Sequence, residues 1–467
     1  MFSVSPLFTP PLDPGCVPAA LWNAAFRRRC AAEAGSRPLA IALERPDGTV
    51  SRFDTFVLPD GMISRALNFR YVERLVKFLL WSRGGCRLHI GGNVEVARFL
   101  AHTFASAGAR RFDEEFMSAK VYRRPFEVVS CSLDEVPATR ECDVPLGRNL
   151  DGCRIGFDLG GSDRKCAALI DGQVVFSEEV TWDPYFETNP QYHYDGIHDT
   201  LKRAAAHLPR VDAIGGSAAG VYVSNEPRVA SLFRGVAPAD FDGRIRSLFR
   251  DLQRDWNGVP FDVVNDGEVT ALAGSMSLGD SAVLGISMGT SVAAGYVTPG
   301  GNITTWLNEL AFAPVDYRED APVDEWSGDR GCAVQYFCQQ GVARLVPQAG
   351  IELPQGMTFP KQLVEVQKLM AAGDARARAI YETIGICFGY AIAHYADFYD
   401  FRHLLILGRV TSGEGGNLLL AKAGEVLRAE FPELAERVAL RTPDEKDKRH
   451  GQAVAAASLP ALRPVNT

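Results

Sequence analysis

Residues 154–170 read RIGFDLGGSDRKCAALI, in which a short apolar run ends in Asp158-Leu-Gly-Gly-Ser162 and a second apolar run follows. Together with Asp171-Gly172 and the apolar residues after it, this stretch predicts a β-hairpin. Gly160 and Gly161 would let the backbone approach a ligand closely, and their N–H groups can bind phosphate oxygens. Taken alone, the same residues also fit an ordinary hairpin with a Gly-Gly turn.

The chain after this hairpin alternates between strand-like and helix-like segments. Apolar runs of strand length are separated by segments in which apolar side chains recur at helical spacing. Strands are predicted at residues 213–216, 261–264, 283–287, 293–297 and 404–407, and helices at residues 197–207, 241–256, 269–275 and 374–399. Strands that alternate with helices predict an α/β fold with much of its sheet parallel.

Composition places the chain among ordinary globular proteins and limits its partners. Of its 467 residues, 46% are hydrophobic and 23% charged, and the formal net charge of −8 disfavours nucleic acid as the main partner. No apolar run reaches the roughly 18 residues of a membrane span. The ten cysteines show no C-x-x-C spacing, so we expect a cytoplasmic protein with reduced, mostly buried thiols and no membrane partner.

Charge and composition also divide the chain near residue 150. Residues 1–150 hold 20 basic and 16 acidic residues, a net charge of +4, whereas the remainder carries −12. Two prolines and two glycines lie between residues 134 and 152, as in a linker. We therefore interpret residues 1–150 as an accessory N-terminal α/β region and residues 151–467 as the main domain.

Three further motifs place polar side chains at or near the ends of apolar runs. In Asn265-Asp266, the Asp can accept the proton of a hydroxyl group that Asn265 orients, or the pair can cap the following helix. Ser287-Met-Gly-Thr-Ser291 offers N–H and hydroxyl donors, or is a plain hairpin turn. In Asn308-Glu309, a buried Glu needs a partner, which is either a ligand or a structural ion pair.

In their order and spacing, these motifs resemble the sugar kinases of the ROK family (repressor, open reading frame, kinase), within the actin-like/hexokinase-like ATPase superfamily. The resemblance covers most of residues 153–460. Asp158-Leu-Gly-Gly-Ser162 resembles the first phosphate motif, Asp-x-Gly-Gly-Thr, and residues 285–295 resemble the second. Residues 404–408 with Gly415-Gly416-Asn417 resemble the adenosine motif.

The resemblance also implies a site for an acceptor sugar. Asn265-Asp266 matches the Asn-Asp pair that in the family binds sugar hydroxyls and supplies the catalytic base. Glu309 matches the Glu of the family's Glu-x-Gly-His, a sugar ligand, and Ser217-Ala-Ala-Gly220 resembles the sugar-side loop without its usual Pro. The catalytic residue implied is Asp266, and the substrate-binding residues are Ser217, Gly220, Asn265, Asn308 and Glu309.

The implied fold is two actin-like, ribonuclease H-like lobes around a cleft, with the N-terminal α/β region in addition. ATP and Mg²⁺ are the implied cofactors, Asp158 would hold Mg²⁺ through water, and a homodimer is implied. The residues implied to bind ATP or its phosphates are Asp158, Gly160, Gly161, Ser162, Lys165, Gly289, Thr290, Ser291, Gly408, Gly415, Gly416 and Asn417.

Two departures from the family pattern concern the substrate and a metal. Phe312 stands where the family's His binds both sugar and a structural zinc, and residues 327–332 keep only the last Cys of the zinc loop, Cys332. Four N or S ligands cannot be assembled here, so we expect no zinc. His193 and His198 are interpreted as surface or capping residues rather than as ligands.

The N-terminal region has its own alternation of elements. A hairpin signal spans residues 39–58, and a helix, a strand and a second helix are predicted at residues 71–81, 88–92 and 94–107. Our hypothesis is a shortened, degenerate copy of the fold of residues 151–467. This copy lacks a strand-end Asp-x-Gly-Gly and an Asn-Asp, so we expect no catalysis there.

Three functions stay open from the sequence. The first is ATP-dependent phosphorylation of a sugar or sugar-derivative hydroxyl, with Asp266 as the base. The second is a catalytically weak, sugar-binding regulator or sensor of the ROK type, for which Phe312 leaves room. The third is an ATPase that acts on a protein partner. Phosphorylation of a sugar separates the first from the other two.

Overall fold

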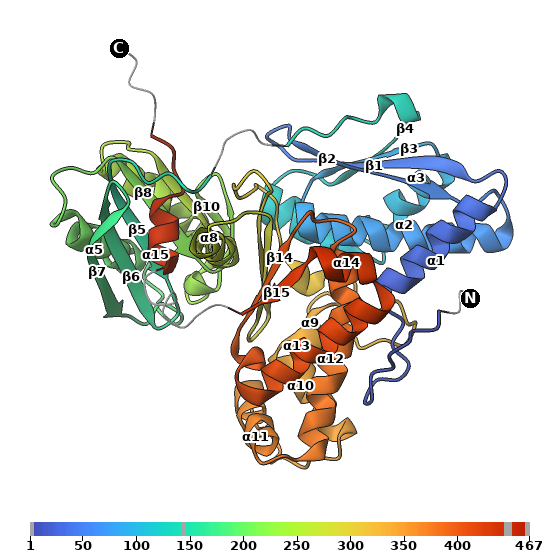
Figure 1. The fold of residues 1–467 in the computed structure, drawn as a ribbon. Coiled ribbons are helices and arrows are strands. Elements are labelled where there is room, and N and C mark those ends of the chain that lie inside the picture. The colour runs from blue at the N-terminus through green and yellow to red at the C-terminus, as the bar shows by residue number, and fades with distance from the viewer. Residues whose placement is uncertain (1–3, 142–145, 443–450, 463–467) are drawn as a thin grey trace. The chain divides into compact units, whose positions relative to one another are not determined.

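The computed structural model describes residues 4–141, 146–442 and 451–462 (Figure 1). The chain forms two compact units, one with Met1–Glu141, Ile286–Ala293 and Thr305–Arg441, the other with Cys142–Gly285, Ala294–Thr304 and Thr442–Thr467. The N-terminal region thus shares its unit with residues 305–441. The predicted division of the chain near residue 150 stays a prediction. No helix of the described residues is both long and apolar enough to cross a membrane.

The second unit is built on a five-stranded sheet in the order β11-β8-β5-β6-β7. Its strands are β5 (Cys153–Leu159), β6 (Asp163–Ile170), β7 (Gln173–Thr181), β8 (Ala213–Ala218) and β11 (Phe261–Asn265). β8 pairs in parallel with both β5 and β11, whereas β6 pairs antiparallel with both β5 and β7. The α/β fold and the hairpin after Asp158 are confirmed. The carboxyl ends of three parallel strands meet at one edge, which is where such sheets bind ligands.

Helices cover both faces of this sheet (Figure 1). Apolar residues of α5 (Pro190–Ala205) and α7 (Leu248–Asp255) share one core with β5 and with Cys166 and Ala168 of β6. α8 (Asp266–Leu278) and α15 (Gly451–Ala457) pack together on the other face, where α15 contacts Ala167 and Leu169. Alternate residues of β6 therefore enter two separate cores, as the two-residue period of a strand requires.

Two glycines allow α15 to approach the sheet closely. A Cβ atom on Gly156 of β5 would lie 1.7 Å from the carbonyl oxygen of Ala453, and one on Gly215 of β8 would lie 1.7 Å from that of Ala456. The parallel register places Gly156 opposite Gly215. Neither position has room for a side chain as long as α15 stays in place.

The segment between β8 and β11 differs from the predicted single helix over residues 241–256. A π-helical turn, η4 (Phe241–Ile245), precedes α7, and the short α6 (Pro238–Asp240) precedes η4. Gly243, a poor helix former, lies within this π-helical turn. The other elements of the segment are β9 (Val221–Val223), β10 (Glu226–Val229) and the 3-10 turn η3 (Ser231–Phe233).

The N-terminal region contains a four-stranded sheet in the order β2-β1-β3-β4. Its strands are β1 (Arg37–Glu44), β2 (Val50–Val57), β3 (Arg87–Gly91) and β4 (Glu127–Cys131). Its helical segments are α1 (Ala19–Ala32), α2 (Met62–Arg83), α3 (Val94–Thr103), α4 (Arg111–Glu115), η1 (Phe116–Tyr122) and η2 (Leu133–Glu135). The predicted hairpin, helix, strand and second helix are present, and α2 begins earlier than predicted, at Met62.

The strand order of this sheet matches the order β6-β5-β8-β11 of the second unit, but one pairing differs in direction. β1 pairs with β3 antiparallel, whereas β5 pairs with β8 in parallel. In the second unit a third hairpin strand, β7, precedes the helix. The described residues of the N-terminal region contain no counterpart of β7, so the chain enters β3 in the opposite direction. The degenerate-copy hypothesis stays a prediction.

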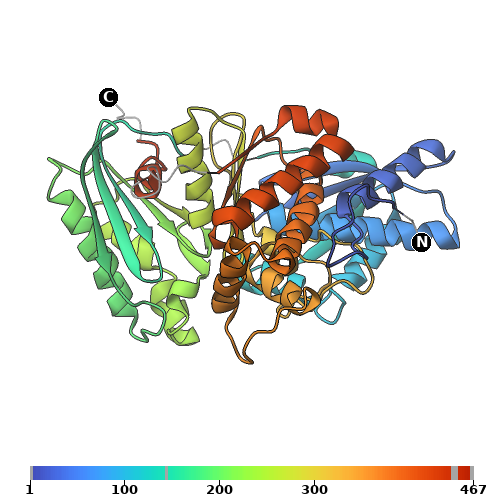
Figure 2. The same cartoon turned by 60° about the horizontal axis from the view of Figure 1, so that its bottom comes forward.

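A third sheet has the order β13-β12-β14-β15. Its strands are β12 (Val283–Met288), β13 (Val292–Val297), β14 (His403–Leu407) and β15 (Ala439–Arg441), and the short turns η5 (Leu310–Phe312) and η6 (Arg409–Thr411) belong to the same part of the chain. The helices here are α9 (Val334–Phe337), α10 (Gln339–Gln348), α11 (Phe359–Ala371), α12 (Ala375–Tyr395), α13 (Gly413–Glu430) and α14 (Pro432–Arg437). α12 and α13 lie side by side (Figure 2) because Gly385 and Gly389 of α12 leave room for the α13 backbone and Val426.

Candidate functional site

Asp158 and Ser217 lie side by side at the carboxyl ends of β5 and β8. The parallel register pairs the two residues, and the Ser217 hydroxyl donates a hydrogen bond of 2.6 Å to Asp158 Oδ1. Both side chains are buried. Burial raises the pKa of Asp158, while the Ser217 hydrogen bond and the charge of Lys165 oppose that rise. The fold therefore brings together one predicted phosphate-site residue and one predicted sugar-site residue.

Asn265 and Asp266 lie where β11 ends and α8 begins. Asn265 caps the helix, since its Oδ1 accepts a hydrogen bond of 2.7 Å from the Gly267 N–H. Its Nδ2 donates to the Gly220 carbonyl at 2.7 Å, which ties α8 to the loop after β8. Because Asn265 makes the cap, the Asp266 carboxylate is left half-buried at the first helical position, at the same sheet edge as Asp158.

Asp266 is electrostatically coupled to Asp158. Burial raises the pKa of Asp266, and the negative charge of Asp158 raises it further, to about 6, although the Gly267 N–H donates to the Asp266 carboxylate. A carboxyl group with this pKa is ionised at neutral pH and can still accept a proton, as a general base must. Two carboxylates that repel each other also form a suitable environment for a cation such as Mg²⁺.

Tyr222 also belongs to this environment and was not predicted. Burial raises the pKa of Tyr222, and the negative charge of Asp266 adds to the rise. The Tyr222 hydroxyl donates to the Ala219 carbonyl at 3.2 Å. A single tyrosine after a Ser-Ala-Ala-Gly loop carries no signal in the sequence that would have distinguished it from the other tyrosines.

The Gly-Gly turn between β5 and β6 lies at the same edge. The Gly160 N–H donates a hydrogen bond of 2.9 Å to the Asp163 carbonyl, and the Gly160 carbonyl accepts a hydrogen bond of 2.8 Å from Trp182 Nε1. A Cβ atom on Gly161 would lie 2.1 Å from the Tyr185 hydroxyl oxygen. Neither glycine has a positive φ, so the constraint on Gly161 comes from the approach of the Tyr185 side chain and not from backbone conformation.

The polar residues of the turn are Ser162 and Lys165. Ser162 is exposed, and its hydroxyl donates to Asp163 Oδ2 at 2.9 Å. Lys165 lies opposite Asp158 in the antiparallel register, and its Nζ is 3.2 Å from Asp163 Oδ1. Burial lowers the pKa of Lys165, but Asp163 and Asp158 outweigh burial and raise it. A cationic Lys165 thus lies beside the carboxylate edge.

Replacing Ser217 with alanine is expected to weaken any cation held by Asp158. The variant loses the hydroxyl that stabilises the ionised Asp158, so the pKa of Asp158 should rise. Changes to a residue that orients a metal ligand typically cost about tenfold or more in metal affinity. Titration of Mg²⁺ binding should show this loss, whereas Ser231→Ala, at an exposed serine of the same unit, should leave the Mg²⁺ affinity unchanged. Equal Mg²⁺ affinity in Ser217→Ala and wild type would contradict the prediction.

In the first unit, the turn after β12 and the end of β14 are neighbours. The Gly289 N–H donates to the Ser291 carbonyl at 3.0 Å, and the side chains of Thr290 and Ser291 are exposed. Gly408 has a φ of +102°, and a Cβ atom there would lie 2.4 Å from the Met288 carbonyl oxygen. The predicted second phosphate motif and the start of the predicted adenosine motif therefore meet.

The remaining residues of the predicted adenosine motif lie in the first turn of α13. Gly415 and Gly416 are buried and make packing contacts. A Cβ atom on Gly415 would lie 2.3 Å from Tyr381 Cζ, and one on Gly416 would lie 1.8 Å from the Thr411 carbonyl oxygen. Of the three predicted residues, only Asn417 exposes its side chain.

Asn308 and Glu309 are held by the C-terminal end of α2. The Asn308 N–H donates to the Ser82 carbonyl at 3.0 Å, and the Glu309 N–H donates to the Trp81 carbonyl at 2.9 Å. Asn308 Oδ1 accepts a hydrogen bond of 2.7 Å from the Tyr399 hydroxyl. Asn308 is buried and Glu309 half-buried. The N-terminal region therefore contacts the segment in which the sequence predicted a sugar ligand.

Phe312 packs against the same region. Its ring centroid lies 4.3 Å from that of Trp81, 5.5 Å from Phe112 and 6.4 Å from Phe116. The residue that stands in place of the family's His is thus part of an aromatic cluster. Phe312 has no polar side-chain group and cannot hydrogen-bond to a sugar. Any such bond would have to come from neighbouring residues.

Residues 327–332, compared above with the family's zinc loop, contain Asp329 in a network of buried ion pairs. Asp329 lies 3.1 Å from Arg74, 2.8 Å from Lys77 and 2.5 Å from Arg110, all from the N-terminal region. Burial would raise the pKa of Asp329, but Arg74 and Lys77 hold it below its usual value. Within the described part of the chain, no group of three or more His, Cys, Asp and Glu residues could hold a metal ion.

The interpretation of His193 as a surface or capping residue is wrong. His193 is fully buried in α5, where its ring meets Trp182, Tyr192 and Phe233 edge-on. Burial lowers its pKa, so this histidine is neutral. Trp182 follows β7 and Phe233 lies in η3, so their contact with α5 was not visible in local spacing. His198 is half-buried and lies edge-on to Trp256.

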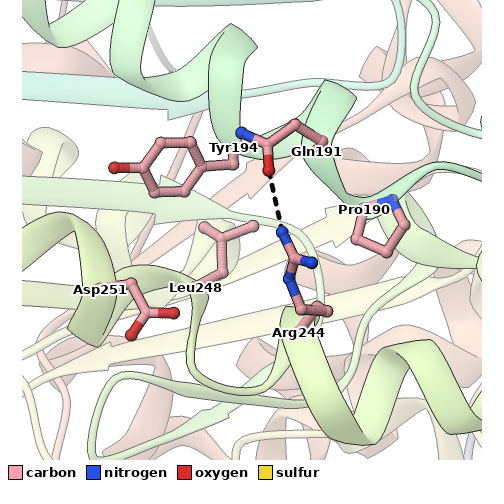
Figure 3. A pocket seen from close by; sticks show the side chains of 6 residues that line it. All are labelled: Pro190, Gln191, Tyr194, Arg244, Leu248 and Asp251. Carbon is pink, nitrogen blue, oxygen red and sulfur yellow. Dashed lines mark hydrogen bonds between the residues drawn. The ribbon is translucent and has the colours of Figure 1, made fainter.

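A surface hollow of about 220 Å³ lies between α5 and the segment of η4 and α7 (Figure 3). Arg244 donates to Gln191 Oε1 at 2.9 Å across it. The lining residues are Pro190, Gln191, Tyr194, Arg244, Leu248 and Asp251. None of the predicted site residues is among them, so this hollow is separate from the carboxylate edge.

Comparison with known proteins supports the fold. No family model and no curated protein matches the chain. Among solved structures, the chain is similar to a ROK hexokinase from Thermus thermophilus, with a TM-score of 0.52 and 18% identity over 66% of this chain and 97% of that one. It is also similar to a ROK family transcriptional regulator, a homologue of the E. coli MLC protein, with a TM-score of 0.51 and 17% identity over 66% and 79%. The chain therefore has the ROK-type, actin-like fold that its motifs predicted.

Proposed function

We propose that this chain is an ATP-dependent carbohydrate kinase that transfers the γ-phosphoryl group of ATP to a hydroxyl group of a sugar or sugar derivative. The observation that carries the proposal is the pair of carboxylates, Asp158 and Asp266, at the carboxyl edge of one sheet. Their repulsion and burial raise the pKa of Asp266 to about 6. One carboxylate can thus serve as a base while the other faces a cation, as phosphoryl transfer requires.

Each of the proposed site residues in the second unit has its own role in the reaction. Asp266 would accept the proton of the acceptor hydroxyl, while Asn265, which caps α8 and bonds to the loop at Gly220, fixes the start of that helix. Asp158, oriented by Ser217, would hold Mg²⁺ through water, and Mg²⁺ would neutralise charge on the phosphates. Lys165 and Ser162 supply a positive charge and a hydroxyl donor beside the Gly-Gly turn.

The residues of the first unit supply the other predicted contacts. We propose that Thr290 and Ser291, which are exposed in the turn after β12, bind phosphate, and that Gly408 and Asn417 lie at the adenosine. Gly415 and Gly416 act through packing, because both face protein atoms. Glu309 is the proposed sugar ligand, with Asn308 beside it.

The test is release of ADP from Mg-ATP across a panel of hexoses, amino sugars and polyols. The expected result is turnover that depends on one class of acceptor, with the phosphorylated sugar identified as the product. A chain that binds sugars but releases no ADP with any of them would favour a sugar-binding regulator, which the similarity in fold to a ROK regulator makes the second candidate. ATP hydrolysis without a sugar would point to an ATPase with a protein partner.

The kinase reaction is expected to lose activity in acid, with its midpoint near pH 6. Asp266 must be ionised to accept a proton, and its raised pKa means that protonation begins about two pH units above that of an ordinary aspartate. The profile of kcat/KM for Mg-ATP against pH, which reports the pKa values of the enzyme before Mg²⁺ is bound, should show one acid limb near 6. An acid limb near 4 would show that the base is a carboxylate in an unperturbed environment.

A further inference from the structure

The contacts between α2 and residues 306–312 carry an inference that rests on the proposed function and extends it to the N-terminal region. We propose that this region positions the acceptor-binding Glu309 through the C-terminal end of α2, with Arg83 as the positioning residue. The sequence assigned no role to the region, and the strand-end motifs needed for catalysis are missing from it.

The backbone of α2 holds the segment directly. The carbonyl groups at a helix C-terminus have no partner within the helix, and here those of Trp81 and Ser82 accept the N–H groups of Glu309 and Asn308 at 2.9 and 3.0 Å. Asn308 has a φ of +50°, in the left-handed region that asparagine adopts more readily than most residues with a side chain. The two hydrogen bonds to α2 hold the backbone on both sides of this turn.

Arg83, the last residue of α2, contacts Trp306 within the segment and Tyr399 outside it. Its guanidinium carbon lies 3.3 Å from the ring centroid of Trp306 and 4.7 Å from that of Tyr399, distances at which a cation is attracted to an aromatic face. Tyr399 in turn donates its hydroxyl hydrogen to Asn308 Oδ1. Arg83 also donates to the Phe398 carbonyl and is itself buried. One buried side chain therefore links the residues that flank and orient Asn308.

The position of α2 is in turn fixed by buried charges. The Lys77 ammonium, fully buried, lies 2.8 Å from Asp329 and 3.1 Å from Asp113. Asp113 also accepts a hydrogen bond of 2.5 Å from Trp81 Nε1. Because opposite charges in a buried site are costly to separate, α2 cannot shift without breaking these pairs. The end of α2 is thus a fixed support for residues 306–312.

The test compares Arg83→Met with wild type in the full-length chain. Methionine keeps the aliphatic bulk but loses the cation. The expected result is a rise of about tenfold in KM for the acceptor sugar, since small misplacements of a binding group have effects of this size or larger, with KM for ATP changed less than about twofold. Amide hydrogen exchange in peptides covering residues 306–312 should become faster, and exchange in β5 and β8 should not.

Two further variants keep the experiment decisive. Tyr399→Phe removes only the hydroxyl that bonds to Asn308 and should change the sugar KM and the exchange of residues 306–312 in the same direction, by less. Arg87→Met, at an exposed arginine of β3 that pairs with Glu127, is the matched control and should change neither. Equal rises in both KM values, or faster exchange throughout the chain, would mean that Arg83 only stabilises the fold.

Hydrogen exchange separates this inference from the proposed function. A wild-type chain that phosphorylates no sugar would reject the kinase proposal, yet exchange at residues 306–312 in Arg83→Met would still test the support by α2. Unchanged exchange at those residues in Arg83→Met overturns the inference, whatever the activity. Faster exchange there together with a selective rise in the sugar KM establishes the inference and the role of Glu309 together.

Discussion

Replacement of Asp266 by asparagine is expected to lower kcat for sugar phosphorylation by about 10³-fold, because a general base contributes roughly 10² to 10⁴ to the rate. The amide has nearly the same shape as the carboxylate and can still hydrogen-bond to a hydroxyl, so sugar binding should change by no more than a few-fold. Steady-state turnover and calorimetric sugar binding measure the two quantities separately.

The matched control for this variant is Asp262→Asn. Asp262 lies on the same strand, β11, and burial raises its pKa too, but it pairs in register with Gly215 rather than with the site residues at the strand end. Its replacement should leave kcat within about twofold of wild type. An Asp266→Asn variant that keeps more than a tenth of the wild-type kcat would show that another group accepts the proton.

Asp266→Asn, which should lower activity, is expected to raise the stability of the folded chain. The pKa of Asp266 is raised in the folded chain to about 6, against about 3.9 for an unfolded aspartate. The folded state therefore binds the proton more tightly, and the resulting stability is lost as pH rises from about 4 through 6. Asparagine cannot ionise, so Asp266→Asn should unfold at a higher temperature than wild type at pH 8, and this advantage should shrink toward pH 4.

Gly215→Ala has the largest expected effect on stability. The new methyl group would lie 1.7 Å from the Ala456 carbonyl oxygen, so α15 must move away from β5 and β8. Overpacking of a rigid core costs about 3 kcal/mol, and here the atom that must yield belongs to backbone. We expect a loss of this size in the free energy of unfolding, measured by chemical denaturation with the fluorescence of the tryptophans as the signal.

The control for Gly215→Ala is Gly243→Ala, the same chemical change within the same unit. No atom lies within 4 Å of a Cβ at Gly243, and its φ is not positive. Alanine also has the better helix propensity, so this variant should be as stable as wild type or slightly more so. Equal stability of Gly215→Ala and wild type would mean that α15 does not pack on the sheet as described.

Local sequence patterns were sufficient to predict the strand ends that build the carboxylate edge. Apolar runs bounded by Asp158, Ser217 and Asn265 predicted β5, β8 and β11, and alternation with helices predicted that these strands run parallel. Carboxyl ends of parallel strands meet at one edge, so the proximity of the site residues followed from topology. The identity of the helix cap in Asn265-Asp266 did not, because only the backbone shows that Asn265 makes the cap and that Asp266 takes the first helical position.

The sequence by itself thus determined most of the strands and helices, their order and the residue types at the strand ends, because strand and helix periods and turn residues act over a few neighbouring positions. The tertiary structure alone decided what lies around them. It decided the burial of His193, the pairing of Asp329 with Lys77, the direction of β3 and the support of Asn308 and Glu309 by α2. These contacts join residues far apart in the chain, and their energies depend on burial and geometry that no local pattern records.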